Sequence, residues 1–513
     1  MKRLPTSLHL TVALVGLIGL IPACSFPGSV QQQQPPPATA TVAATAESAP
    51  TLVVPPAVTT DITGTTTLTD ETTVTNATTD TTAMTATTAL TAPTTVTATG
   101  ATTASGGRIL VPTTTPATTT QSSTTPSVSP ALPAADEASA RLQVPEGFAV
   151  RIYAEGLGAP RLMTVGPDGL LYVADIDGNR VVRLPDTDND GLADEVQVIA
   201  EDLPGVHNAE WFDGWLYVAE DSQIERLRDE DGDGAFETRE LVTDNIPAPV
   251  RHRTRTLHFG PDGKLYVTAG SSSNNEPESD PRRAAILRFN PDGSIPDDNP
   301  FIDALNDQRH PIWAEGLRNS VDFLFLPDGR LWADHNGSDL LSDDLPPEEI
   351  VIEVEKGQHY GWPYCYTPTL GVVPPGAEEV RDERVALDPA VLSDCSQAVP
   401  ALFTDLAHQA PLGIVQYNAS AFPAAYQGNL FVAYHGSWNS TEPRDCRVQM
   451  IVVAEGMPVA GEPFLTGFRD SEDQQCGNAW GRPAGVTVGA DGALFVSDDQ
   501  NGNIYRIVYV GEE

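Results

Sequence analysis

A short apolar run that follows a glycine turn recurs six times between Gly166 and Asp499. The copies read GPDGLLYVAD, FDGWLYVAED, GPDGKLYVTAG, LPDGRLWADH, YQGNLFVAYH and GADGALFVSDD. Short runs of Leu, Tyr, Phe and Val favour a β-strand, and the Gly-containing turn before each run favours a tight hairpin. Long helical periodicity is absent from this part of the chain. The pattern therefore predicts an all-β fold.

The spacing of the repeats predicts the number and kind of the sheets. The turn glycines are separated by 45, 49, 66, 99 and 64 residues. A four-stranded propeller blade takes about 40 to 50 residues, so the first two spacings fit bare blades and the later ones fit blades with insertions. We therefore predict a six-bladed β-propeller over residues 139–513, with polar residues after the repeated strands gathered on one rim. The six turn glycines are Gly169, Gly214, Gly263, Gly329, Gly428 and Gly492.

The segment before the repeats has a different composition. Residues 27–135 are mostly Thr, Ala, Pro, Ser and Val, with Arg108 as the one basic residue. Such a segment buries too little apolar surface to offset the entropy that is lost on ordering. Residues 24–138 are therefore predicted to form a low-complexity, disordered Thr/Pro-rich stalk in front of the propeller.

Residues 1–23 have the features of an export signal. Lys2 and Arg3 precede an apolar run over residues 10–21, and Ala23 stands directly before Cys24. The run is too short for a transmembrane helix. A Cys after a small residue resembles the bacterial lipobox, with an ordinary signal peptide as the alternative. We predict lipidation at Cys24 and a lipid anchor to the membrane at the outer face of the cell envelope, at the cell surface or in the periplasm.

Charge and cysteine content limit the partners and the compartment. The 513 residues carry a formal charge of −41, with 65 acidic and 26 basic residues from Asp136 onward. Nucleic acid is excluded as a partner, because phosphate recognition needs clustered Lys and Arg. Neutral substrates and divalent cations suit the negative electrostatic field of this chain.

Four further cysteines in an exported chain predict two disulfides. The equal spacings of 30 residues favour the pairs Cys365–Cys395 and Cys446–Cys476 among the three connectivities that the sequence permits.

Two acidic loops have the ligand spacing of calcium sites. The loop from Asp229 fits the pattern D-x-D-x-D-G-x5-E in full, whereas the loop from Asp186 has Gln197 in place of the last Glu. Their flanks look like strands, so both are predicted hairpin loops that hold structural calcium, with solvated acidic turns as the alternative. The predicted ligands are Asp229, Asp231, Asp233 and Glu240 in one loop and Asp186, Asp188 and Asp190 in the other.

Three stretches gather Arg, His and Asn near predicted blade ends. Clustered arginines in so acidic a protein are suited to neutralise a bound anion, although pairing with surface carboxylates is the alternative. A His flanked by arginines has a lowered proton affinity, which favours a neutral imidazole that can act as a base. The stretches are RHRTRTL at 251–257, GLRN at 316–319 with DHNGSD at 334–339, and HGSW at 435–438 with GRP at 481–483.

Several motifs, in order along the chain, resemble the glucose/sorbosone dehydrogenase family. The resemblance covers roughly residues 142–510 and implies a six-bladed propeller that uses pyrroloquinoline quinone (PQQ) and calcium to oxidise a sugar. The motifs are TRTLHFGPDGKLYVTAGSSSN, DPRRAAILRFNPDGS, GLRN, DDLPPEEI, GQHYGWPYCY, AFPAAYQGNLFVAYHGSWN and GRPAGVTVGADGALFVSDD.

The resemblance also implies roles for individual residues. His252 matches the family's general base, and Arg318 would stabilise negative charge on the quinone. His207 is a candidate substrate contact, with a buried core histidine as the alternative. The implied cofactor contacts are Arg318, Asn319, His435, Trp480 and Arg482, and the implied calcium site of the cofactor is Asn336, Gly337 and Ser338 with Asp344 nearby.

Three positions depart from the family's pattern. His435 stands where soluble glucose enzymes of the family have a lysine, and Trp480 stands where the family has a second arginine. Asp322 lies three residues after GLRN, and its negative charge is a departure from the family's pattern that is expected to disturb the charge on the quinone.

The function expected from these observations is the PQQ- and calcium-dependent oxidation of an aldose or a sorbosone-like aldehyde. The chain carries no CxxCH haem motif, so electrons are expected to pass to an external acceptor, such as a separate cytochrome or a quinone. Two alternatives remain. One is a non-catalytic cell-surface propeller that binds a carbohydrate or a protein partner, and the other is a calcium-dependent, lactonase-like hydrolase with a metal-bound water.

Overall fold

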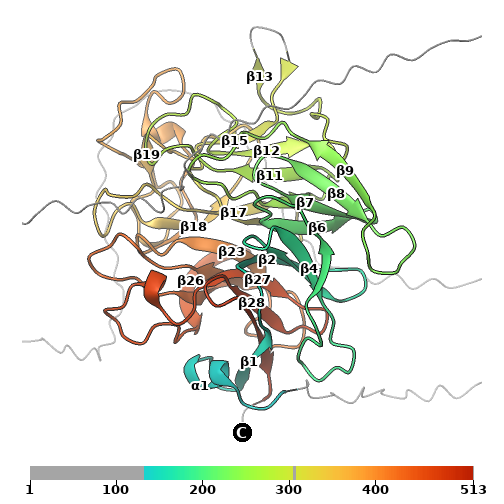
Figure 1. Cartoon of the computed structure of the whole chain (residues 1–513). Helices are drawn as coiled ribbons and strands as arrows, with labels where there is room; N and C mark the ends of the chain where they lie inside the picture. The colour runs from blue at the N-terminus through green and yellow to red at the C-terminus, as the bar shows by residue number, and fades with distance from the viewer. Residues whose placement is uncertain (1–131, 304–307, 512–513) are drawn as a thin grey trace, which may run out of the picture. The chain divides into compact units, whose positions relative to one another are not determined.

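The repeated strand of the sequence is the second strand in each of six antiparallel sheets (Figure 1). The computed structural model describes residues 132–303 and 308–511, which all lie in one structural unit, Ala117–Glu513. The predicted export signal, Cys24 and most of the predicted stalk lie outside the described residues. Among the residues that are described, no helix has the length and apolar character needed to cross a membrane.

Three sheets come from the first part of the propeller. The first contains β2 (Pro160–Val165), β3 (Leu171–Asp175), β4 (Arg180–Leu184) and β5 (Gln197–Ala200). The second contains β6 (Asn208–Phe212), β7 (Trp215–Ala219), β8 (Ile224–Arg228) and β9 (Thr238–Thr243). The third contains β10 (Leu257–Phe259), β11 (Leu265–Ala269), β12 (Ala285–Phe289) and β15 (Ile312–Glu315), with a separate pair β13 (Ile302–Asp303) and β14 (Gln308–Arg309) in its insertion.

Three further sheets complete the series. The fourth contains β16 (Phe323–Phe325), β17 (Leu331–His335), β18 (Glu348–Glu353), β22 (Phe403–Asp405) and β20 (Gly371–Val372). The fifth contains β23 (Pro411–Gln416), β24 (Leu430–Tyr434), β25 (Arg447–Ala454) and β26 (Met457–Leu465). The sixth contains β27 (Pro483–Val488), β28 (Leu494–Asp498), β29 (Asn503–Tyr509) and β1 (Phe148–Ala154).

The sheets follow one another around a closed ring. The first strand β2 packs beside β6 of the second sheet and β27 of the sixth, and β23 packs beside β16 and β27. The second and third sheets adjoin through β6 and β10, and the third and fourth share a core that includes Tyr266 and Phe323. The predicted six-bladed β-propeller is confirmed for the described residues.

The last blade joins the two ends of the propeller. β1 pairs antiparallel with β29 in the register Phe148 opposite Tyr509, and Figure 1 shows β1 beside the C-terminal strands. This pairing adds a strand from the start of the propeller to the outer edge of the sixth sheet, and it thereby closes the ring. Before β1, the helix α1 (Glu137–Arg141) packs against that strand and therefore crosses the boundary predicted at residue 139.

The repeated turn is built from its Asp and Gly. Asp168 Oδ1 accepts the N–H of Leu170 at 3.1 Å, and Asp491 Oδ1 accepts that of Ala493 at 3.0 Å. The glycine between them adopts φ +81° in the first turn and +83° in the last, a left-handed conformation that other residues rarely adopt. The local sequence thus fixes where the second strand begins in these two blades.

Both predicted disulfides are confirmed. The Cα atoms are 5.8 Å apart in Cys365–Cys395 and 5.8 Å apart in Cys446–Cys476. The first disulfide holds the insertion that accounts for the longest repeat spacing, and the second holds the segment that follows β24. The remaining short elements are β19 (Cys365–Tyr366), β21 (Val380–Arg381), and the 3-10 helices η1 (Cys395–Gln397) and η2 (Cys476–Asn478).

Candidate active site

A cleft of about 460 Å³ lies on one rim of the propeller. Apart from Glu348 at the start of β18, its lining residues precede the first strands of several blades or follow the second strands. Because these two strands are antiparallel, the start of one and the end of the other meet on the same rim, as the repeats predict. A cleft of this size is typical of a small-molecule site. The predicted site residues that line it are His252, Arg318, Asn319, Asn336, Gly337, His435 and Arg482.

His252 is a neutral imidazole at this cleft. Its Nδ1 lies 3.1 Å from the carbonyl oxygen of Ser271 and 2.8 Å from Ser271 Oγ, and that hydroxyl donates to the Ser273 carbonyl at 2.7 Å. Both Ser271 oxygens can then only accept, so we assign the proton to Nδ1 and the lone pair to Nε2. Burial and the nearby charges of Arg318 and Arg251 lower the pKa of His252 to about 3. The ring therefore stays a neutral base at ordinary pH.

Arg318 is buried and held by four hydrogen bonds from its guanidinium. Nε donates to the Asn274 carbonyl at 2.9 Å, and Nη2 donates to Asn274 Oδ1 at 2.9 Å and to Asp339 Oδ2 at 2.6 Å. Nη1 donates to the Asn336 carbonyl at 3.3 Å. Since a guanidinium has five N–H groups, one N–H on Nη1 is left for a molecule in the cleft.

Asp339 balances the positive charge on this side of the cleft. Besides Arg318, its Oδ2 lies 3.5 Å from Arg251 Nη2, and its Oδ1 accepts from Asn439 Nδ2 at 3.1 Å. Burial lowers the pKa of Arg318, whereas the Asp339 carboxylate raises it, and the net direction is downward. The cleft thus combines two arginines with one carboxylate on this side.

Asn319 and Asn336 connect the fourth and fifth blades at the floor of the cleft. Asn336 Nδ2 donates to the Pro411 carbonyl at 2.7 Å, and the Asn336 N–H donates to the Asn319 carbonyl at 3.1 Å. The side-chain oxygen of Asn319 is buried and has no hydrogen-bond partner among the described residues. A buried acceptor without a donor is costly, so a donor supplied by a bound molecule would stabilise this position.

Glu348 is a cleft residue to which the sequence pattern assigned no role. It is the first residue of β18, and its carboxylate accepts the N–H of Gly337 at 2.9 Å and that of His408 at 3.1 Å. Burial raises the pKa of Glu348 to about 8. The motif DDLPPEEI contains this residue, but only the fold shows that its carboxylate reaches the loop after β17.

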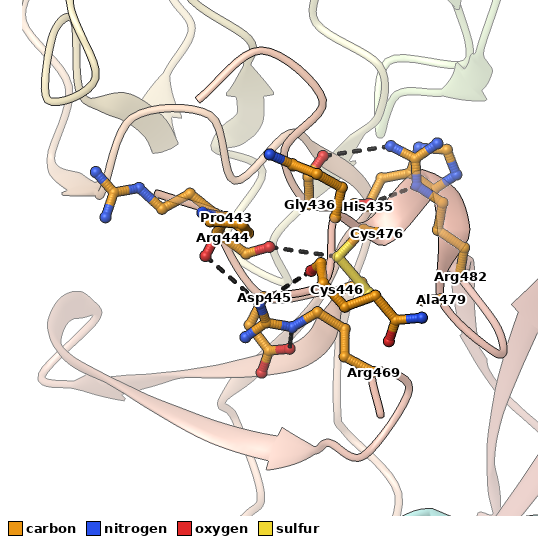
Figure 2. Close-up of a disulfide and its surroundings, with 12 residues drawn as sticks. His435, Gly436, Pro443, Arg444, Asp445, Cys446, Arg469, Cys476, Ala479 and Arg482 are labelled. Atoms are coloured by element: carbon orange, nitrogen blue, oxygen red, sulfur yellow. Dashed lines mark hydrogen bonds and ion pairs between the residues drawn. A yellow bond between two sulfur atoms is a disulfide. The ribbon is translucent and has the colours of Figure 1, made fainter. Parts of the chain in front are cut away.

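His435 and Arg482 also line the cleft. Arg482 Nε donates to the His435 carbonyl at 2.6 Å and its Nη2 donates to that of Gly436 at 3.3 Å, and Figure 2 shows the Cys446–Cys476 disulfide beside this segment. Burial lowers the pKa of His435 to about 4, although Asp499 acts in the opposite direction. These residues therefore add one guanidinium and one buried imidazole to the cleft.

Two predicted contacts are corrected by the structure. Trp480 does not line the cleft, because its indole N–H donates to Glu137 Oε1 at 3.1 Å and its ring lies under the Arg141 guanidinium, near α1. The Asp344 side chain is 84% exposed and pairs with Arg444 at 3.0 Å, so it is turned away from the predicted calcium site.

His207 and Ser338 also lie outside the cleft lining. His207 is 2% exposed, and its Nε2 accepts from Arg161 Nε at 3.1 Å, which agrees with the alternative of a buried core histidine. Ser338 is buried, and its hydroxyl lies 3.4 Å from the Asn274 carbonyl. Asp322 is likewise no cleft residue, because its oxygens accept from His258 and from the Ile414 N–H, both at 3.0 Å.

Each acidic hairpin loop brings its aspartates together. Asp186, Asp188 and Asp190 place carboxylate oxygens within 4.8 Å of one another, and so do Asp229, Asp231, Asp233 and Glu237. The predicted ligand Glu240 lies outside this group, because it lies on β9 opposite Arg226 and pairs with that residue at 2.5 Å. The calcium-loop pattern assumes a helix after the loop, whereas here a strand carries position 240 away.

Comparisons with known proteins agree with this geometry. The model of the family described as TrAA12-like matches residues 142–510. An uncharacterized protein of Borreliella burgdorferi is 26% identical over 391 residues, which cover 73% of this chain and 93% of that protein. A pyrroloquinoline quinone-dependent sugar dehydrogenase of Hypocrea jecorina is 26% identical over 397 residues, covering 70% of this chain and 87% of that protein. A calcium structure of a Trichoderma reesei family AA12 enzyme shares the fold, with a TM-score of 0.59, 22% identity and coverage of 72% of this chain and 97% of the other.

Proposed function

The chain belongs to the TrAA12-like family, and from this premise we propose that it is an oxidoreductase that oxidises a sugar with PQQ as its redox cofactor. The observation that carries the proposal is the neutral His252 beside Arg318 in the rim cleft. The named PQQ-dependent relative from Hypocrea jecorina supports the choice of cofactor and substrate class. The comparisons agree with the family that the sequence motifs predict.

The cleft residues fit a flat, polyanionic quinone. Arg318 and Arg482 both line the cleft of a chain whose formal charge is −41. Arginine suits this task because its planar donors match carboxylates. The unpartnered oxygen of Asn319 adds a buried acceptor, and the remaining N–H of Arg318 adds a donor. These groups would hold PQQ through its carboxylates and ring atoms.

When bound, PQQ supplies the quinone that takes up a hydride from the sugar carbon. His252 Nε2 has no hydrogen bond to the described residues and takes the proton of the sugar hydroxyl. The Ser271 carbonyl and hydroxyl hold Nδ1–H, which fixes the tautomer and the orientation of the ring. Arg318 keeps a positive charge where negative charge develops, and its hydrogen bonds to Asn274 and Asp339 hold it in place.

Calcium is part of the same proposal. The carbonyl oxygens of Asn336 and Gly337 with the Glu348 carboxylate form an all-oxygen set of the kind that calcium prefers. Ser338 was predicted with this set through its carbonyl oxygen and stays in the proposal, while its hydroxyl lies 3.4 Å from the Asn274 carbonyl. We assign structural calcium to the two acidic hairpin loops as well, with Glu237 in place of Glu240.

Export and lipidation at Cys24 complete the proposal and rest on the sequence of residues 1–24. A lipid anchor would hold the enzyme at the outer face of the cell envelope, where disulfides form and persist. An acceptor outside this chain would then receive the electrons.

The full chain, stripped of metal and supplied with PQQ and calcium singly and together, tests this function by dye reduction across a panel of aldoses. Turnover should need both additions and should fall about a thousandfold in His252→Ala. His310→Ala is the matched control, since this histidine does not line the cleft. A folded protein that binds sugar without reducing the dye would instead be a carbohydrate-binding propeller, and turnover of lactones with calcium alone would make it a hydrolase.

A further inference from the structure

An exposed tryptophan stands at the mouth of the cleft. Trp438 lines the cleft, and the residue is 62% exposed. It is the last residue of the HGSW segment, His435 to Trp438, which follows β24. An apolar ring of this size in contact with water lacks the favourable free energy that burial would give. Its exposure at a cleft therefore indicates a surface that a ligand covers.

The backbone under Trp438 is fixed. The Gly436 N–H donates to the Gln409 carbonyl at 2.8 Å, and the Ser437 hydroxyl donates to Gln475 Oε1 at 2.9 Å. Gly436 has φ +76°, and a Cβ there would lie 2.4 Å from Cys476 Sγ, so the segment rests directly on the disulfide (Figure 2). An exposed ring on a fixed backbone loses little entropy when a ligand binds.

The residues beside Trp438 are polar hydrogen-bonding groups. Asn439 donates to Asp339 Oδ1 at 3.1 Å, and Asp339 Oδ2 lies 3.5 Å from Arg251 Nη2. All three residues line the cleft. The Arg251 side chain is 45% exposed, so its guanidinium keeps N–H groups in reach of a ligand. The same cleft therefore presents a flat apolar face, a carboxylate that accepts and a guanidinium that donates.

We propose that Trp438, with Asp339 and Arg251, forms a second saccharide subsite at the mouth of the cleft. A pyranose ring has an apolar C–H face and a hydroxyl edge, which match the indole face and the charged pair. The proposal rests on the proposed function, because the sugar unit to be oxidised lies at His252. It assigns the substrate class: a disaccharide or a longer saccharide rather than a monosaccharide.

A flat aromatic electron acceptor is the other ligand that an exposed indole could stack against. A quinone offers only acceptor oxygens, so it gives no hydrogen to the Asp339 carboxylate, whereas a sugar hydroxyl does. A sugar hydroxyl also accepts from Arg251. The charged pair beside the ring therefore favours the saccharide.

Kinetics of the full chain with PQQ and calcium test the subsite. Wild type, Trp438→Ala, Trp438→Phe and Val250→Ala are compared on glucose and on α- and β-linked glucose disaccharides. Trp438→Ala should raise KM for the preferred disaccharide about tenfold and lower the ratio of kcat/KM for the disaccharide over glucose about tenfold, while Trp438→Phe restores most of both. Val250→Ala removes an exposed apolar side chain that precedes Arg251 but does not line the cleft, and it should change neither value.

Calorimetric titration of the chain with the same disaccharides separates this proposal from the proposed function. Disaccharide binding that weakens about tenfold in Trp438→Ala would support the subsite even if no sugar were oxidised. Turnover of glucose with an unchanged disaccharide ratio in Trp438→Ala would overturn the subsite and leave the function standing. A change confined to the KM of a quinone acceptor would overturn it as well, because Trp438 would then bind the acceptor.

Discussion

Asp499 receives the Nε2–H of His435 at 2.9 Å, and its second carboxylate oxygen pairs with Arg161. Although burial raises the pKa of Asp499, His435 and Arg161 lower it to well below its usual range, so the carboxylate stays charged. The bond assigns the His435 proton to Nε2 and leaves Nδ1 as an acceptor. Asp499 therefore positions a cleft residue although Asp499 itself does not line the cleft.

Asp499→Asn should weaken PQQ binding and lower kcat/KM by about tenfold, the lower end of what loss of an orienting partner costs. The amide can present its N–H to His435 and reverse the tautomer. Titration of PQQ by fluorescence quenching and dye-reduction kinetics are the measurements. Asp445→Asn is the matched control, because Asp445 pairs with Arg469 near the disulfide and does not line the cleft. Equal losses in both variants would mean that the effect is only structural.

The pH dependence of kcat/KM follows from His252. Its lowered pKa of about 3 keeps the ring neutral as the pH falls, so activity should show no loss centred near pH 6.5. Arg251→Gln removes one of the positive charges that lower this pKa, and the acidic limb of the profile should move to higher pH. An acidic limb near pH 6.5 in the wild type that Arg251→Gln leaves in place would contradict the assignment of His252 as the base.

His258 joins three neighbouring blades through two carboxylates. It contacts Glu210 of β6 through Nδ1 and Asp322, just before β16, through Nε2 at 3.0 Å. Although burial lowers the pKa of His258, Glu210 and Asp322 raise it to about 10, so the ring is charged in the folded protein. Its contribution to stability is present below the unfolded value near 6.5 and is lost as the pH rises through about 10.

His258→Ala should lower the free energy of unfolding by about 3 kcal/mol at pH 7, because it leaves Glu210 and Asp322 without their cation. Urea unfolding measures the change. Adding Glu210→Gln and Asp322→Asn to His258→Ala should recover part of the loss, since the charges are then gone. No recovery in the triple variant would show that packing of the ring, and not charge pairing, is the source.

Either Glu237 or Glu240 is assigned as the glutamate ligand of calcium in the acidic loop at Asp229, and substitutions distinguish the two. Glu237→Gln should weaken calcium binding at this loop about tenfold, whereas Glu240→Gln should leave it unchanged, because Glu240 pairs with Arg226. Calorimetric titration of the metal-free full chain with calcium measures both. A loss in Glu240→Gln alone would restore the ligand set that the sequence pattern predicts.

The blades could be predicted because each one repeats a local signal. A glycine turn before an apolar run, preceded by Asp at Gly169 and Gly492, fixes the start of a strand without help from distant residues. The pairing of β1 with β29 has no such signal, since the two strands come from opposite ends of the propeller.

The sequence predicted the site residues that belong to a recognisable motif. It did not predict the residues whose side-chain direction depends on the register of their segment. His252, Arg318 and Arg482 reach the cleft, whereas Trp480, two positions before Arg482, is turned to α1. Glu348 and Asp499 are held at the site by contacts between segments far apart in the sequence, which spacing alone does not reveal.

The closure of the ring by β1 also sets an order of events during biosynthesis. Phe148–Ala154 is synthesised long before its partner Asn503–Tyr509, so the sixth sheet is completed only when the final strand has emerged. Such a distant pairing forms slowly, and until then β1 is an open strand edge that can recruit other chains. A chain cut short by even its last strand would leave the propeller unclosed, and proteases would recognise it as unfinished.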